Sequence, residues 1–157
     1  HSPVGIVRIS ADDRCITEIH FCKESELTVT IQQGQDHILL QNCTEQLIEY
    51  FQGIRRSFDF PMHQAGTPFQ ESVWNKLVTI PFGKTISYLD LARKLGDPKV
   101  IRAAGTANGR NKIAIAVPCH RVIGTNLEMV GYAGGIWRKK WLLEHEAKIA
   151  HGVQTLF

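Results

Sequence analysis

The pattern of hydrophobic and polar positions divides the chain near residue 65. In the first part, two short apolar segments at residues 4–9 and 15–21 predict strands, and a polar turn at residues 12–14 separates them. Further candidate strands are residues 27–31 and the short stretch around Phe58 and Phe60. The first part is therefore expected to be rich in strands.

One helix interrupts these strands. Within residues 37–51, apolar side chains recur at helical spacing, at Leu40, Cys43, Leu47 and Tyr50. Residues 61–66 then have the composition of a linker. We expect a small α/β domain over residues 1–65 and a second domain over residues 66–157.

In the second part, candidate capping residues predict where several helices begin and end. Thr67 is a candidate N-cap, followed by Pro68 in the first turn and by Gln70 at the capping-box position. This helix is expected to end at the Pro-Phe-Gly turn of residues 81–83.

Two shorter helices follow. Ser87 is a candidate cap for a helix at residues 88–95, and Asp97 with Pro98 opens another helix that runs to about Asn108. The tight turn between them contains Gly96. Two short capped helices across such a turn are typical of a helix-turn-helix.

Charge is distributed unevenly over the two parts. Residues 1–65 contain five Lys/Arg and nine Asp/Glu, whereas residues 66–157 contain thirteen and six, so the net charges are −4 and +7. A basic domain is the electrostatic signature of a polyanionic partner, but a solvated basic surface fits the charge equally well. The last short helix carries small residues around one long side chain, Arg102. It can approach a nucleic-acid backbone or minor groove closely, or simply pack tightly, and together with the charge it favours DNA.

Composition excludes several other classes. A hydrophobic content of 43% with 21% charged residues is ordinary for a globular protein. No apolar stretch approaches the roughly 20 residues of a membrane helix, and no secretory signal is visible. The four cysteines form no Cys-x-x-Cys pair and lack zinc-site spacing. We expect a reducing intracellular compartment, with Cys15, Cys22 and Cys43 as core residues.

The fourth cysteine stands in a different context. Cys119 is followed by His120 and Arg121, at the end of the apolar run of residues 113–117. Cationic neighbours stabilise a thiolate, which is the nucleophilic form of cysteine. Taken alone, the commoner role of such a cysteine is a small buried hydrophobe. If the segment is extended, neighbouring side chains point to opposite faces, so we expect no direct bond between Cys119 and His120.

Several segments together are similar to a known family. The matching segments are residues 67–70, 80–88, 102–103, 111, 118–124, 131–135 and 141–146. At these positions the chain resembles the O6-alkylguanine-DNA alkyltransferases, also called methylated-DNA–protein-cysteine methyltransferases. The resemblance covers nearly the whole chain and is strongest from Thr67 to Glu146.

This resemblance implies a reaction without a cofactor. Cys119 would attack the alkyl carbon on the guanine oxygen and keep the alkyl group as a thioether. His120 would serve as its base through a water, and Glu146 would orient the histidine. Asn111 would brace these groups, and Tyr88 would donate a hydrogen bond to the departing guanine. O4-alkylthymine is expected as a second substrate.

The resemblance also implies how DNA is held. The partner would be double-stranded DNA bound through its minor groove, and Arg102 would fill the gap left by the flipped base. The expected DNA-contacting residues are Ser87, Tyr88, Arg102, Ala103, Gly105, Thr106 and Arg110. The expected substrate pocket consists of Val122, Gly131, Tyr132, Ala133 and Trp137. The loop of residues 125–130 lacks the glycine that is common in the family.

The implied fold is a ribonuclease H-like α/β domain followed by a mainly helical domain with a winged-helix-like helix-turn-helix. Asp12 and Thr17 stand where some relatives have zinc ligands, so we expect no metal. The protein is expected to be a monomer, cytoplasmic in a bacterium or nuclear in a eukaryote, without a membrane partner. Two other hypotheses stay open: a lesion-recognising or regulatory DNA-binding module without transfer activity, and an unrelated cysteine hydrolase.

Overall fold

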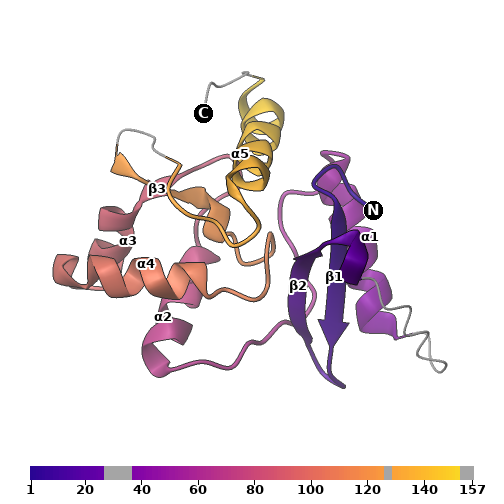
Figure 1. Cartoon of the computed structure of the whole chain (residues 1–157), viewed down its shortest axis with the longest axis horizontal. Coiled ribbons are helices and arrows are strands. Elements are labelled where there is room, and N and C mark those ends of the chain that lie inside the picture. Colours follow the sequence, from indigo (N-terminus) through magenta and orange to yellow (C-terminus); the bar gives the residue numbers. More distant parts are fainter. Residues whose placement is uncertain (27–36, 126–128, 153–157) are drawn as a thin grey trace.

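The computed structural model describes residues 1–26, 37–125 and 129–152, which form two lobes lying side by side (Figure 1). The N-terminal lobe consists of β1 (Ile6–Ala11), β2 (Ile16–Cys22), a 3₁₀ turn at Glu24–Glu26 and α1 (Ile38–Phe51). The C-terminal lobe consists of α2 (Pro68–Leu77), β3 (Ile86–Ser87), α3 (Tyr88–Lys94), α4 (Ile101–Gly109), β4 (Val122–Ile123) and α5 (Ile136–His151). The helices predicted from capping and periodicity are present.

The hairpin of β1 and β2 forms around the predicted polar turn. Asp12 Oδ1 accepts hydrogen bonds from the backbone N–H groups of Arg14 and Cys15 at 2.8 and 2.7 Å, which is the local bonding that makes Asp a turn residue. The strands pair antiparallel, with a bulge where Ser10 faces Glu18 and Ala11 faces Ile16. The position left over on β2 is Thr17.

This bulge decides which edge of β2 meets the C-terminal lobe. Backbone groups of successive residues alternate between the two edges of a strand, so one extra residue resets the alternation. Ile16 exchanges hydrogen bonds with Pro61 and His63, and Ile19 exchanges them with Lys112 and Ala114 on the same edge. The second lobe is thereby bonded directly to β2 through the segment that leads to Cys119.

One predicted strand is wrong and another cannot be compared. Phe58 and Phe60 are not in a strand. Their rings lie 5.6 Å apart, and the ring of Phe58 lies 5.7 Å from that of Tyr50. Strand-like pairing occurs instead at Met62, a residue of the expected linker, which forms an isolated parallel β-bridge with Ile16 of β2. The candidate strand at residues 27–31 lies outside the described residues.

The predicted helix caps are confirmed in the C-terminal lobe. The side chains of Thr67 and Ser87 each accept from the backbone three residues on, and both complete a capping box. The helix expected from Pro98 begins as a 3₁₀ turn, Pro98–Val100, before α4 proper. Small residues let α4 pack closely on α2, where Trp74 Nε1 donates to the Ala107 carbonyl at 2.9 Å.

The approach to Cys119 is not extended, contrary to the expectation. After Ile113 the backbone folds through turns, Ile115 has a φ of 69°, and Cys119–Arg121 is a 3₁₀ turn. The apolar run is buried, and its backbone bonds to β2 only at its start, through Ala114 and Ile19; after that it bonds to itself and to Asn111. The argument that Cys119 and His120 point to opposite faces of a strand therefore fails.

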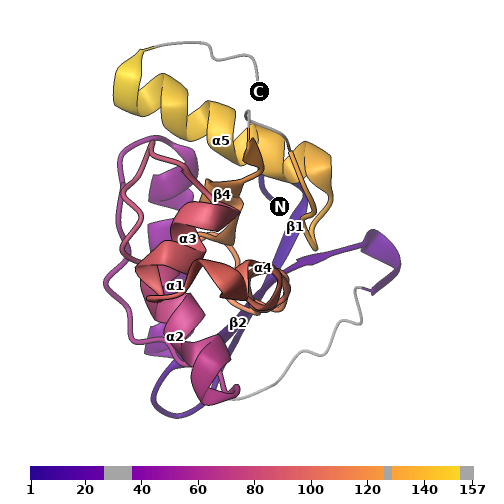
Figure 2. The same cartoon turned by 90° about the vertical axis from the view of Figure 1, so that its left-hand side faces the viewer.

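Helix α5 runs along the top of both lobes (Figures 1 and 2). Its N-terminal Arg138 donates to the Val4 carbonyl at 2.7 Å, and near its other end the Ile149 carbonyl accepts from Arg56 at 3.3 Å. Among the described residues, no helix combines the length and hydrophobicity that crossing a membrane requires. The lobes share one buried core through this helix.

Candidate active site around Cys119

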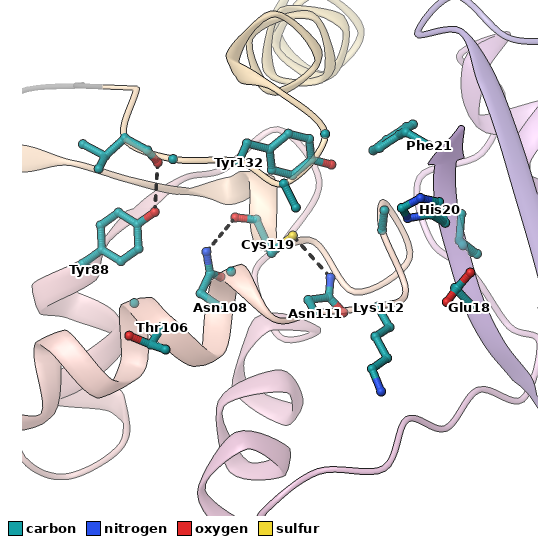
Figure 3. Close-up of a pocket in the computed structure, with 18 of the residues that line it drawn as sticks. Glu18, His20, Phe21, Tyr88, Thr106, Asn108, Asn111, Lys112, Cys119 and Tyr132 are labelled. Carbon is teal, nitrogen blue, oxygen red and sulfur yellow. Dashed lines mark hydrogen bonds between the residues drawn. The ribbon is translucent and has the colours of Figure 1, made fainter. Parts of the chain in front are cut away.

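Cys119 lies at the base of a cavity of about 810 Å³ between the lobes. Figure 3 shows its side chain between those of Asn108 and Asn111, with Tyr88 and Tyr132 nearby and Phe21 of β2 on the opposite wall. Besides Cys119, the lining residues come from β2, α3, α4, the segment of residues 111–114 and the loop of residues 130–134. Both lobes therefore shape the space in front of the thiol.

Asn111 fixes the thiol in place. Its Nδ2 donates to Cys119 Sγ at 3.3 Å and to the Val117 carbonyl at 2.8 Å. Its Oδ1 accepts from Ile113 N at 3.1 Å and from Gln64 Nε2 at 2.7 Å. Because Oδ1 is held by two donors, the amide presents its N–H groups to the sulfur. These contacts are consistent with the bracing role expected for Asn111, which stays a prediction.

Lys139 is a buried cation that the sequence analysis missed. It is fully buried, and its Nζ donates to the carbonyls of Val122, Val130 and Gly131 at 2.7, 3.0 and 3.4 Å. Burial lowers the pKa of Lys139 to about 8, against the influence of a Cys119 charge. Lys139 lies on the buried face of α5 with Leu142, Leu143 and Glu146, so a lysine at core-facing helical spacing was the signal.

The thiol of Cys119 feels two opposing influences. Burial raises its pKa, whereas the hydrogen bond from Asn111 and the charge of Lys139 lower it, and burial prevails. The resting group is therefore the thiol. A base is needed to generate the thiolate, and the thiolate once formed meets a donor and a cation.

His120 and Glu146 form a buried pair beside the thiol. Their Nε2 and Oε1 atoms are 2.7 Å apart, and both side chains are essentially inaccessible. Arg121 binds the same carboxylate through two nitrogens, Nε to Oε2 and Nη2 to Oε1, each at 2.9 Å. Burial on its own would raise the pKa of Glu146, but the charges and hydrogen bonds of His120 and Arg121 outweigh it and hold the pKa below its usual range.

These contacts define the protonation of His120. Burial lowers the pKa of His120 despite the opposing pull of Glu146, so the imidazole is neutral near pH 7. An ionised carboxylate only accepts hydrogen bonds, so Nε2 carries the proton and Nδ1 carries the lone pair. Nδ1 is buried and has no hydrogen-bond partner among the described residues. The site thus contains a neutral base with a free lone pair in the same turn as the thiol.

Several expected DNA-contacting residues lie at the mouth of the cavity. Tyr88, Arg102, Gly105 and Thr106 line it, and Tyr88 Oη donates to the Val130 carbonyl at 3.1 Å. The other three lie outside the lining: Ser87 caps α3, Ala103 is exposed on α4, and Arg110 follows that helix.

The expected pocket residues divide in the same way. Gly131, Tyr132 and Ala133 line the cavity, and Gly134 presses so closely on Phe21 that an added Cβ would lie 2.6 Å from its ring. Val122 is buried outside the lining, and its carbonyl accepts from Lys139.

Trp137, the fifth expected pocket residue, also lies outside this lining. It is 54% exposed under the Arg138 guanidinium at 4.4 Å. The reason is that the chain turns at Gly135, which has a φ of 91°, and begins α5 with the Trp137 side chain directed to solvent.

Asn108 is a second residue that the sequence analysis missed. It is buried on α4 and lines the cavity, where its Nδ2 contacts the Cys119 carbonyl at 3.4 Å. Its Oδ1 has no partner among the described residues. No signal in the sequence distinguished it from the other small and polar residues of this helix.

One group in the described part of the chain has the composition of a metal site. His20, Cys22 and Glu26 place their ligand atoms within 4.8 Å of one another. Arg8 lies beside this group: its guanidinium donates a hydrogen bond to Glu18, and this bond together with the charges of Cys22, Glu18 and Glu26 raises the pKa of Arg8. The expectation that the protein uses no metal remains a prediction.

Comparison with known proteins places the chain in a family. Residues 68–148 match the family described as 6-O-methylguanine DNA methyltransferase, DNA binding domain, and residues 1–64 match its ribonuclease-like domain. The chain belongs to the 6-O-methylguanine DNA methyltransferase family. The two matched domains correspond to the two lobes, so the family fold is a ribonuclease-like domain followed by a helical DNA-binding domain.

Individual members of this family are similar over nearly their full length. A methylated-DNA–protein-cysteine methyltransferase of Methanosarcina acetivorans is 41% identical over 92% of this chain and 94% of its own. The constitutive methyltransferase of Bacillus subtilis is 40% identical over 96% and 93%. The structure of Mycobacterium tuberculosis OGT in complex with DNA superposes with a TM-score of 0.83, at 40% identity over 94% of this chain and 90% of that one.

The buried cation gives a first prediction. Replacing Lys139 by Met removes a positive charge near Cys119, so the pKa of the thiol should rise by about one unit, which makes the thiolate about tenfold scarcer at neutral pH. Iodoacetamide modification of the Cys119 peptide, followed by mass spectrometry across pH, measures this. Lys140→Met is the matched control, because that neighbouring lysine is exposed. A folded Lys139→Met protein with an unchanged profile would show that the cation does not act on the thiol.

Proposed function

We propose that this protein repairs alkylated DNA directly, by moving the alkyl group from O6-alkylguanine irreversibly to Sγ of Cys119. The observation that carries the proposal is the buried, free thiol at the base of an interlobe cavity, next to a neutral histidine held by a buried carboxylate. Its relatives of about 40% identity are named methylated-DNA–protein-cysteine methyltransferases. O4-alkylthymine, which presents an equivalent alkyl–oxygen bond, is a second proposed substrate.

The first step is deprotonation of the thiol. The proton leaves Sγ and, through a water, reaches Nδ1 of His120, the ring nitrogen with the free lone pair. The resulting imidazolium is stabilised by Glu146, and the thiolate by the Asn111 amide and the Lys139 charge. Because Arg121 already balances the charge of Glu146, the imidazolium is favourable only while the thiolate exists. The base and the nucleophile are therefore created together.

The second step is displacement at the alkyl carbon. A bond forms between Sγ and that carbon while the bond from the carbon to the guanine oxygen breaks, and its electron pair stays on the guanine. Tyr88 then donates a hydrogen bond to the leaving base, and the proton held by His120 passes through water to the guanine, which restores the neutral imidazole. Burial raises the pKa of Tyr88, an effect increased by a Cys119 charge, so the phenol remains protonated and able to donate. The thioether has no route back to the thiol, so each molecule acts once.

The DNA must deliver a single base into this cavity. Helix α4 carries Arg102 at the cavity mouth and small residues beside it, which suits close approach to a minor groove. Arg102 then occupies the gap left by the extruded base. The DNA backbone on either side of the extruded base would contact a winged-helix-like arrangement of residues, at Ser87, Ala103, Thr106 and Arg110. The DNA complex of the M. tuberculosis relative supports this use of the fold.

The setting of the reaction follows from the same features. All four cysteines are free thiols, and an acceptor thiol must stay reduced, so we place the protein in a reducing intracellular compartment. It needs neither cofactor nor metal for the two steps above, and we propose that it acts as a monomer.

Mass spectrometry tests the chemistry. Incubation with a duplex containing O6-methylguanine should add one methylene mass to the Cys119 peptide, with a stoichiometry of one, and Cys119→Ser should bind the duplex without gaining mass. Binding without modification of the wild-type protein would instead indicate a recognition module. Repeated turnover of an ester or peptide by an unmodified protein would indicate a cysteine hydrolase.

A variant of Arg102 tests the delivery of the base. Arg102→Ala should slow methyl transfer from duplex DNA about tenfold or more, because base extrusion costs a few kcal/mol, and it should leave transfer from the free base O6-methylguanine unchanged. Lys148→Ala removes the same charge from the exposed end of α5 and serves as the control. Equal losses on duplex and free base would contradict the assigned role.

A further inference from the structure

The carboxylate of Glu146 has a further partner in the other lobe. Tyr50 of α1 donates its hydroxyl to Glu146 Oε1 at 2.8 Å, across 96 residues of sequence. The same oxygen contacts His120 Nε2 at 2.7 Å and Arg121 Nη2 at 2.9 Å. Tyr50 therefore shares with the histidine the atom through which Glu146 acts.

The surroundings of Tyr50 hold this hydroxyl in one place. The residue is fully buried, and its ring contacts Phe51, Phe58, Phe82 and His145 with centroid separations of 5.3 to 6.0 Å. Its backbone carbonyl accepts from the ring of His145 at 2.8 Å. Tyr50 thus contacts two successive residues of α5: His145 through its backbone and its ring, and Glu146 through its hydroxyl.

The hydroxyl can act only as a donor. Burial and the adjacent charge of Glu146 raise the pKa of Tyr50 well above its ordinary value, with Arg121 opposing. A phenol that stays protonated next to an ionised carboxylate has one role, which is to donate its proton in a hydrogen bond. This donor draws electron density from the oxygen that also receives the N–H of His120.

We propose that Tyr50 is a positioning residue for alkyl transfer, which tunes the basicity of His120 through Glu146 and makes the N-terminal lobe part of the active site. The inference rests on the proposed function and adds a residue outside the C-terminal domain to it. Packing between the lobes alone would need only the ring, whereas this role needs the hydroxyl. The two can therefore be separated by removing one oxygen.

The charges around the pair fix the direction of the effect. Besides Tyr50, the groups facing Glu146 and His120 are Arg121 in the same turn, the N–H of Gly83 at 3.3 Å and, toward the cavity, Cys119, Lys139 and Tyr132. None of these changes when the hydroxyl is removed. Without it, Glu146 becomes more basic, holds the His120 proton more strongly and raises the pKa of the histidine. A larger fraction of His120 is then protonated at low pH and cannot accept the thiol proton.

Tyr50→Phe is the test, because it preserves the ring and deletes only the donor. The loss of one hydrogen bond to a charged group changes a pKa by about one unit. The acid limb of the rate of methyl transfer from free O6-methylguanine should therefore move to higher pH by about one unit. On that limb the variant should be about tenfold slower, and at pH 8 it should approach the wild-type rate. Phe58→Leu is the control, since it loosens the same aromatic cluster without touching Glu146, and it should leave the profile in place.

A second background keeps the result interpretable if the variant is less stable. In Glu146→Gln the charge that Tyr50 modulates is gone, so adding Tyr50→Phe should change the transfer rate no further. Superimposable profiles of the wild type and a folded Tyr50→Phe would overturn the inference, as would additive losses with Glu146→Gln. A wild-type protein that transfers no methyl group would instead overturn the proposed function.

Discussion

The ionised carboxylate of Glu146 is the constraint on which the rest of the structure depends. It is buried and receives donors from His120, Arg121, Gly83 and Tyr50. An unpaired charge in such a place would be prohibitively unfavourable, so the surrounding segments must supply hydrogen-bond donors to it. The turn of residues 80–83 contributes in two ways: the N–H of Gly83 donates to Glu146, and the Ile80 carbonyl accepts from Arg121, which holds that guanidinium against the carboxylate. Gly83 has a φ of 76°, and an added Cβ would lie 2.5 Å from Ala150, so glycine is required there.

The N-terminal lobe is more than a support for this centre. The edge of β2 forms backbone hydrogen bonds with residues 112 and 114, which follow Asn111 in the chain. Phe21 of the same strand packs against Gly134 in the cavity loop. Through Tyr50 it also reaches the carboxylate. An acidic lobe joined to a basic one thus contributes contacts on three sides of a site whose nucleophile and base both lie in the basic lobe.

The sequence predicted those features that depend on interactions between residues close together in the chain. The caps Thr67 and Ser87, the turn at Asp12 and the periodicity of α1 each depend on residues within a few positions, and the structure has all of them. Family motifs further indicated Cys119, His120, Glu146 and Asn111, which the structure brings together. What failed depended on the environment: the apolar run of residues 113–117 meets β2 only at its start and then forms turns, with the Asn111 side chain, which donates to the Val117 carbonyl, as a further backbone partner.

Long-range contacts explain the residues that were missed. Tyr50 was assigned to the face of a helix, and no local pattern reveals that its hydroxyl meets a residue 96 positions away. Lys139 was not singled out, although its helical spacing to Leu142 and Glu146 placed it inward. The family resemblance placed Trp137 in the pocket, whereas in the structure it lies outside the cavity lining, in the first turn of α5 after Gly135.

The central claim is that burial keeps His120 neutral, while the hydrogen bond to Glu146 holds its proton on Nε2 and leaves the lone pair on Nδ1. Nitrogen-15 NMR of histidine-labelled protein at pH 7 reports this directly, because protonated and unprotonated ring nitrogens resonate in separate regions. The account predicts that His120 shows a protonated Nε2 and an unprotonated Nδ1 in the resting protein. A His120 with both nitrogens protonated, or with the proton on Nδ1, would contradict it.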